Sequence, residues 1–199
     1  MKPGGRAEAL ALQKQLAADF PEIPDYRNAL AMTLSNLAIL ELQSGQFTAG
    51  LALLDQGRPH LQAALKAGPK NPTYRRCYRN SLLVAAECHI NLGDHAQVAT
   101  TADVLARFAY DPAMDTYYAA SYLCHCVKLA DKDANLDKPE AKALTQSYAD
   151  RAMKLLRQAV VVHGFRNVTS LKQDPNLAPL REREEFKKLL AELEKKSKQ

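Results

Sequence analysis

The sequence predicts an all-α protein: a right-handed α-solenoid of stacked helical hairpins that ends in a C-terminal capping helix. The first observation is a repeat, because residues 24–45 recur as residues 72–93, with Leu34 corresponding to Leu82. The second is the spacing of the apolar residues in each copy, three, one and four positions apart, as on one face of an α-helix. The third is that each copy stops at a glycine and is followed by a second apolar helix. This pattern is typical of stacked helical hairpins.

The composition indicates one soluble domain that covers residues 1–199. Hydrophobic residues make up 47% of the chain and charged residues 25%, as in an ordinary globular protein. No apolar run approaches the roughly twenty residues needed to cross a bilayer, and residues 1–6 lack the apolar centre of a secretion signal. We therefore expect a cytoplasmic protein without membrane insertion.

The first predicted helix covers residues 6–20 and occupies the place of the second helix in a truncated repeat. An apolar stripe is expected to form its packed face: Ala9, Leu12, Leu16 and Phe20. The helix stops before Pro21, since proline disfavours a helical conformation in the residue that precedes it. Its own first helix is missing, which suggests that the chain is cut from something longer.

The next repeat covers residues 25–67 and contains two helices. Asp25 is expected to cap the first helix, and Gly45 to end it in the left-handed conformation. The second helix contains Pro59, which cannot donate a backbone hydrogen bond. We therefore expect this helix to bend or break around Pro59.

Two further repeats and a closing segment complete the predicted stack. One repeat covers residues 73–110, with Asp94 as the cap of its second helix, and a longer one covers residues 112–163, with a cap at Asp137. Residues 166–199 form a connector and the capping helix. The capping helix carries a narrow apolar stripe: Phe186, Leu189, Leu190 and Leu193.

These helix pairs resemble tetratricopeptide repeats in their large and small residues. The slots of that family's motif are filled by Leu34, Leu37, Ala38, Gly45, Phe47 and Gly50. The second copy keeps Leu82 and Gly93 but carries His95 and Val98 at the aromatic and small slots. The units are longer than the usual repeat and are similar to its long-helix variant.

Three local strings are similar to the C-terminal tails of planctomycete serine/threonine protein kinases. They are LAADFPEIPDYR at 16–27, YYAAS at 117–121 and LKQDPNLAPLR at 171–181. The resemblance implies a regulatory or substrate-docking tail of a bacterial kinase. The chain has no Gly-rich phosphate loop, no His-Arg-Asp loop and no Asp-Phe-Gly, so we expect no enzyme activity here and any kinase domain elsewhere.

The family register places a partner-binding groove on the first helices of the repeats. The groove-facing positions are Met32, Ser35, Ile39, Asn80, Leu83, Glu87, Tyr117 and Ser121. Packing against a neighbouring unit is the other interpretation, particularly for Ile39 and Leu83. The same register places Leu37 and Leu82 in the core.

A basic patch is the second candidate site, since no Asp or Glu lies between Gln56 and Ala86. The patch consists of Lys66, Lys70, Arg75, Arg76 and Arg79. It is either a solvated face or a docking surface for an acidic or phosphorylated peptide. Nucleic acid is not expected, because an extended base-stacking platform is lacking.

The remaining motifs favour neither a metal nor a cofactor. Cys77, Cys88, Cys124 and Cys126 lie in predicted helices and no Cys-x-x-Cys pair is present, so we expect buried free thiols rather than a zinc site at Cys124 and Cys126. The five histidines are scattered. The sequence thus predicts a protein-interaction module; a structural spacer or oligomerisation element is the alternative, and a helical enzyme is less favoured.

Overall fold

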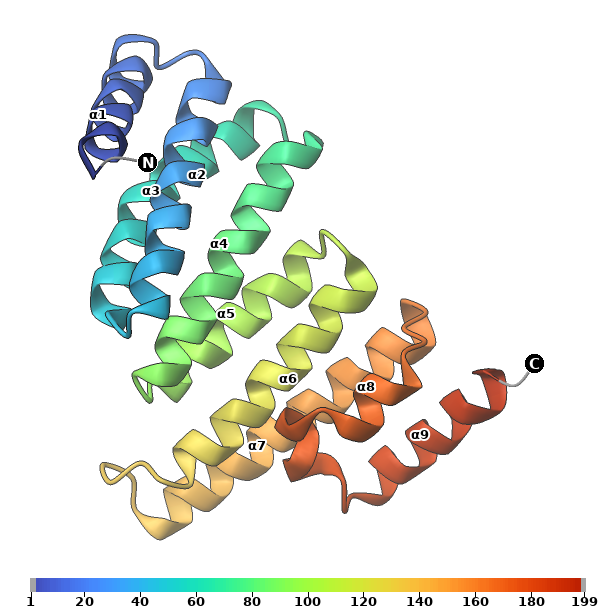
Figure 1. Ribbon diagram of the computed structural model, residues 1–199. Coiled ribbons are helices and arrows are strands. Elements are labelled where there is room, and N and C mark those ends of the chain that lie inside the picture. The colour runs from blue at the N-terminus through green and yellow to red at the C-terminus, as the bar shows by residue number, and fades with distance from the viewer. Residues whose placement is uncertain (1–2, 198–199) are drawn as a thin grey trace. The chain divides into compact units, whose positions relative to one another are not determined.

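The computed structural model describes residues 3–197, and these are helical with no strand among them (Figure 1). The α-helices are α1 (Pro3–Asp19), α2 (Pro24–Gln43), α3 (Phe47–Ala67), α4 (Pro72–Asn91), α5 (His95–Phe108), α6 (Pro112–Ala130), α7 (Lys138–Arg157), α8 (Val168–Gln173) and α9 (Glu184–Ser197). A π-helical turn, η1 (Gln158–Val162), and a 3-10 turn, η2 (Pro175–Leu180), complete the order. Successive helices pack together: α1 on α2, α2 on α3, α5 on α6 and α6 on α7. The prediction of an all-α protein is confirmed.

The contacts divide the chain into two compact units, Met1–Cys88 and His89–Gln199. The boundary falls inside α4, which is one uninterrupted helix. In both units a short turn with a left-handed glycine separates consecutive helices. Gly45 has φ +78° and Gly93 has φ +76°, a conformation that glycine adopts without a steric penalty. The predicted stop at Gly45 is confirmed.

The core of the first unit lies where α2 packs on its neighbours. Leu34 is buried with Ala17 of α1 and Leu30, and Ala38 is buried with Leu54 of α3 and two residues of α4. Leu37 and Leu82, which the sequence analysis placed in the core, are only half-buried. Leu37 is one residue, about 100° of helix rotation, from Ala38, so it lies at the edge of the packed face.

The packed face of α1 differs from the predicted one. Leu12 is 61% exposed, Leu16 38% and Phe20 43%, and Ala9 is exposed too. Instead Ala17, which is buried, faces Leu30 and Leu34 of α2. The small Ala17 side chain lets the two helices approach closely, and the large side chains of the predicted stripe are left on another face.

The N-terminus of α2 also corrects a prediction, because Asp25 is not its cap. The N-cap residue is Ile23, which is extended, and Pro24 is the first helical residue. Proline suits this position, since its missing N–H needs no partner there. The Asp25 carboxylate instead accepts a hydrogen bond of 2.6 Å from the hydroxyl of Tyr74 in α4.

Pro59 does not break α3, which runs as a single α-helix from Phe47 to Ala67. The expected break is therefore wrong, and the alternative, a bend at Pro59, stays a prediction. The proline removes one backbone hydrogen bond, but the helix is held on both sides of it by Leu54 and Leu61, which are buried. Packing on α2 thus outweighs the local loss.

The second unit is organised around α6, on which α5 and α7 pack. The predicted caps are confirmed: the carboxylate of Asp94 accepts from the backbone N–H of Gln97, and Asp137 forms a capping box with Glu140. The α-helical part of α7 ends at Arg157 and continues as the π-helical turn η1 rather than as a regular helix to residue 163.

The C-terminal helix α9 packs in the second unit against α7 and α8. Phe186, Leu189 and Leu193 of its predicted apolar stripe are buried, whereas Leu190 is half-buried. Among the described residues no helix is both long enough and apolar enough to cross a bilayer.

Candidate functional site

A groove lies between α2 and α4 in the first unit; we call it the α2–α4 groove. It has a volume of about 380 Å³. Its lining consists of Met32, Ser35, Asn36 and Ile39 from α2 and of Arg76, Cys77, Asn80 and Val84 from α4. Both flanks are thus regular helices packed against one core, so the groove is formed before any ligand arrives.

The α2–α4 groove combines apolar surface with a few polar groups. Met32 is 42% exposed, although it is a large hydrophobic residue. Asn36 and Asn80, one from each flank, are exposed and can both donate and accept hydrogen bonds. Arg76 is the one charged residue among the lining, and it too is exposed. This composition suits a peptide that offers backbone amides, an apolar side chain and a negative charge.

Four of the predicted groove residues are brought together here, namely Met32, Ser35, Ile39 and Asn80. Leu83 and Glu87 are not among the lining residues. The prediction applied one set of repeat positions to both helices. Leu83 and Glu87 follow Arg76 and Asn80 by seven residues, nearly two full turns, so they lie on the same side of α4, beside the strip of that side that lines the groove.

The other two predicted groove residues, Tyr117 and Ser121, lie in the second unit and are buried. The Tyr117 hydroxyl donates a hydrogen bond of 2.6 Å to the Asp174 carboxylate, and its ring stacks on that of Phe165 at 4.5 Å. Burial, together with the bond to Asp174, raises the pKa of Tyr117 far above its ordinary value. Neither side chain lines an open surface, because α6 is the central helix of its unit.

Asn36, Cys77 and Val84 line the groove but were not predicted to do so. Asn36 follows Met32 by four residues on α2, and Val84 follows Asn80 by four residues on α4. Helical spacing from the residues already identified would have found both. Cys77 is almost wholly buried and forms part of the groove floor.

The predicted basic patch does not form one uniform surface. Lys66, Lys70 and Arg76 are exposed, whereas Arg75 and Arg79 are half-buried. Arg75 and Arg79 both interact with other groups of the protein. Arg76 alone belongs to both the patch and the α2–α4 groove, which makes it the cation best placed to meet a ligand there.

The cysteines are buried free thiols, as predicted. Burial raises the pKa of both Cys124 and Cys126 to about 12. The Cys126 thiol is also within 3.3 Å of the His95 backbone carbonyl oxygen, to which it donates. These two thiols remain protonated at neutral pH and are poor nucleophiles.

The His, Cys, Asp and Glu side chains that could bind a metal or act in catalysis form structural contacts instead, as His95 illustrates. No group of three or more His, Cys, Asp or Glu side chains within the described part of the chain is arranged to hold a metal ion. His95 lies 2.9 Å from the Tyr148 hydroxyl and 3.2 Å from the Asp133 carboxylate. These contacts link α5, α7 and the loop between α6 and α7.

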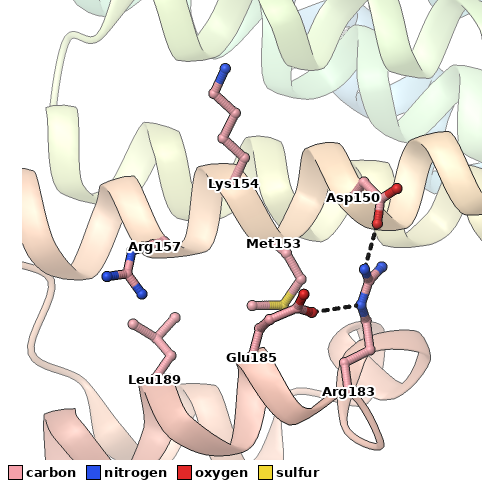
Figure 2. A pocket seen from close by; sticks show the side chains of 7 residues that line it. All are labelled: Asp150, Met153, Lys154, Arg157, Arg183, Glu185 and Leu189. Atoms are coloured by element: carbon pink, nitrogen blue, oxygen red, sulfur yellow. Dashed lines mark hydrogen bonds and ion pairs between the residues drawn. The ribbon is translucent and has the colours of Figure 1, made fainter.

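A further cavity, of about 430 Å³, lies between α7 and the segment that begins α9. Figure 2 shows the side chains that line it. Arg183 spans it, forming ion pairs with Asp150 of α7 and with Glu185. The bond from Arg183 holds the pKa of Asp150 below its usual value. Asp150, Arg183 and Glu185 thus pair with one another, and these ion pairs help to hold the C-terminal helix in place.

Comparison with models of protein families, with curated proteins and with solved structures found no match to this chain. Function is therefore inferred from the α2–α4 groove and from the sequence features that led to it.

Proposed function

We propose that this chain is a non-catalytic protein-interaction module that binds a peptide segment in the α2–α4 groove. The observation that carries the proposal is the groove itself, in which apolar surface, two amide side chains and one arginine converge from two rigid helices. Backbone amides of a bound segment can pair with Asn36 and Asn80, and an apolar side chain can cover Met32.

The proposed ligand carries an acidic or phosphorylated residue. Arg76 is exposed on the rim, and no carboxylate belongs to the lining of the groove. A guanidinium can donate two parallel hydrogen bonds to a carboxylate or a phosphate, which favours either group over a neutral one.

At the level of architecture, we propose a right-handed solenoid of the tetratricopeptide type that serves as the tail of a bacterial serine/threonine protein kinase in a reducing compartment. The support is the repeated sequence, the packing of successive helices, and Gly45 and Gly93 at corresponding turns with nearly equal φ. Gly50 adds to it, because a side chain there would lie 3.3 Å from the Ala38 carbonyl oxygen. The three strings that are similar to kinase tails support the proposal that the parent protein is a bacterial serine/threonine protein kinase.

A photo-crosslinking residue at Met32 tests the proposal, with the same residue at exposed Thr48 of α3 as the control. We expect the protein whose peptide segment binds in the groove to crosslink at position 32 and not at position 48. A synthetic peptide of the crosslinked segment should then bind the purified chain, and Arg76→Glu with Asn80→Ala should weaken that binding by about tenfold or more. Lys154→Glu, in the second unit, changes the charge equally and should leave it unaltered. Equal crosslinking at both positions would refute the groove as the binding site.

A structural spacer or oligomerisation element is the second candidate, and one observation favours it. Leu12 and Leu16 of α1 and Phe20, directly after it, form an exposed apolar row, spaced four residues apart. Rows of this kind on a helix surface mark interaction sites more often than chance exposure does.

A further inference from the structure

A second, open cavity in the first unit is lined by residues of α1, α2 and α3; we call it the α1–α3 cavity. It also measures about 380 Å³ and shares no lining residue with the α2–α4 groove. Its apolar walls include Ala17, Leu30 and Leu34. Its polar lining comes from all three helices: Lys14, Arg27, Gln56 and His60.

The charge of this lining is entirely positive. Lys14 and Arg27 belong to it, and none of its residues is an Asp or a Glu. A cavity with two cations and no carboxylate attracts an anion.

Arg27 is oriented before any ligand binds. Its Nε donates a hydrogen bond of 2.9 Å to the backbone carbonyl of Pro21, in the turn between α1 and α2. This bond fixes the plane of the guanidinium and leaves its two terminal nitrogens for other acceptors. The terminal nitrogens of a guanidinium match the spacing of two oxygens in a carboxylate or a phosphate.

His60 belongs to the lining, although its Nδ1 atom is sealed from solvent. Burial lowers the pKa of His60, and the positive charge of Arg27 lowers it further. At neutral pH the imidazole is therefore uncharged, and Arg27 and Lys14 are the cations of the lining.

We propose that the α1–α3 cavity binds a small organic anion, with its carboxylate or phosphate on Arg27 and Lys14 and its apolar body against Ala17, Leu30 and Leu34. The cavity is larger than an inorganic anion needs, and its walls are apolar, so the ligand carries a hydrocarbon part as well as the charge. This site is separate from the peptide-binding groove and does not depend on it.

Calorimetric titration of the full chain with phenyl phosphate, benzoate and benzyl alcohol tests the proposal. At least one of the two anions should bind saturably, and neutral benzyl alcohol should bind at least tenfold more weakly. Whichever of phenyl phosphate and benzoate binds more tightly shows whether the site prefers a phosphate or a carboxylate. Arg27→Gln should weaken anion binding by about tenfold or more, the usual effect of losing a hydrogen bond to a charged group. Arg58→Gln is the matched control, because Arg58 is an exposed cation of α3 outside the cavity lining.

Lys14→Gln keeps the test decisive if Arg27→Gln disturbs the turn at Pro21. Lys14 is exposed on α1, so its replacement should preserve the fold while weakening anion binding several-fold. The proposal is overturned if neither anion binds saturably, if Arg58→Gln weakens binding as much as Lys14→Gln and Arg27→Gln do, or if benzyl alcohol binds as tightly as the anions.

Discussion

At the scale of single residues, the environment of each polar or reactive side chain decides what it can do. Cys124 and Cys126 lie on the central helix of the second unit and have no exposed surface. Tyr74 and Tyr117 are buried as well, and the hydroxyl group of each donates a hydrogen bond to an aspartate. Arg76, with the same charge as Arg75, differs from it because it is exposed at the rim of a groove.

The buried thiols predict how stability changes at alkaline pH. The pKa of Cys124 and Cys126 is raised from 9.0 to about 12 in the folded protein, so the unfolded chain loses these protons first. Their contribution to stability is complete below about pH 9 and is lost as the pH rises toward 12. Between pH 9 and pH 10 each thiol should lower the free energy of unfolding by about 1 kcal/mol.

Urea unfolding of the wild type and of Cys124→Ala with Cys126→Ala, followed at several pH values, measures this effect. The double variant loses packing and should be less stable at neutral pH. Its stability should nevertheless fall less steeply above pH 9. Parallel pH profiles for the two proteins would mean that the thiols do not titrate as their burial implies.

At the scale of elements, tertiary packing decides whether a local sequence signal, such as a cap, a glycine or a proline, ends a helix. Caps and glycine stops act within one turn, and those at Asp94, Asp137 and Gly45 act as the sequence predicts. Pro59 is also a strong local signal, yet α3 continues through it. The difference is that buried residues on both sides of Pro59 hold the helix against α2, whereas no packing opposes a cap.

Pro59→Ala should therefore stabilise the protein. Alanine restores a backbone N–H that can donate to the carbonyl of Asp55, and it removes the ring that crowds the preceding turn. Part of this gain is offset because the unfolded chain becomes more flexible. We expect a net increase of about 1–2 kcal/mol in the free energy of unfolding, measured by chemical denaturation.

Pro24→Ala is the matched control for this variant. Pro24 is the first residue of α2, where its ring conformation suits the helix and no hydrogen bond is missing. Its replacement should leave stability unchanged or lower it slightly. A loss of stability at both positions would show that the proline in α3 is accommodated without any cost.

At the scale of the whole molecule, helices are stabilised mainly by their neighbours in the chain. Each unit has its own buried residues, in the first around Leu34 and Leu54 and in the second around Leu123 and Leu156. The helix at the start of the chain is the exception, since Leu12 and Leu16 remain exposed on it, whereas Leu10 packs against the core.

The exposed row on α1 predicts self-association of the isolated chain. Leu12, Leu16 and Phe20 could be buried against a second copy of the chain. Each Å² of apolar surface removed from water would stabilise the dimer by about 25 cal/mol. Light scattering should show a mass that rises with protein concentration. Leu12→Gln with Leu16→Gln should abolish this rise, while Thr48→Gln, at an exposed polar position on α3, should not.

A constant monomer mass at high protein concentration would remove oligomerisation as a candidate function. It would not affect the α2–α4 groove, because that site shares no residue with the row on α1.

The sequence by itself determined the all-α class, the helix boundaries to within a few residues, the glycine turns and two of the caps. These features follow from interactions between residues close in the chain: hydrophobic periodicity, the missing N–H of proline, and the left-handed conformation of glycine. It also found four of the eight residues that line the α2–α4 groove, three on α2 and one on α4, because positions on one helix face can be traced by helical spacing alone.

Only the tertiary structure decided which face of each helix meets which neighbour. The small Ala17, not the larger Leu12, faces α2, and Tyr117 is buried because its helix is packed on more than one side. The Arg27 and His60 side chains, 33 positions apart in the chain, come to line one cavity for the same reason. Helix rotation and packing partners depend on contacts between distant residues, and a repeat pattern in one sequence does not encode them position by position.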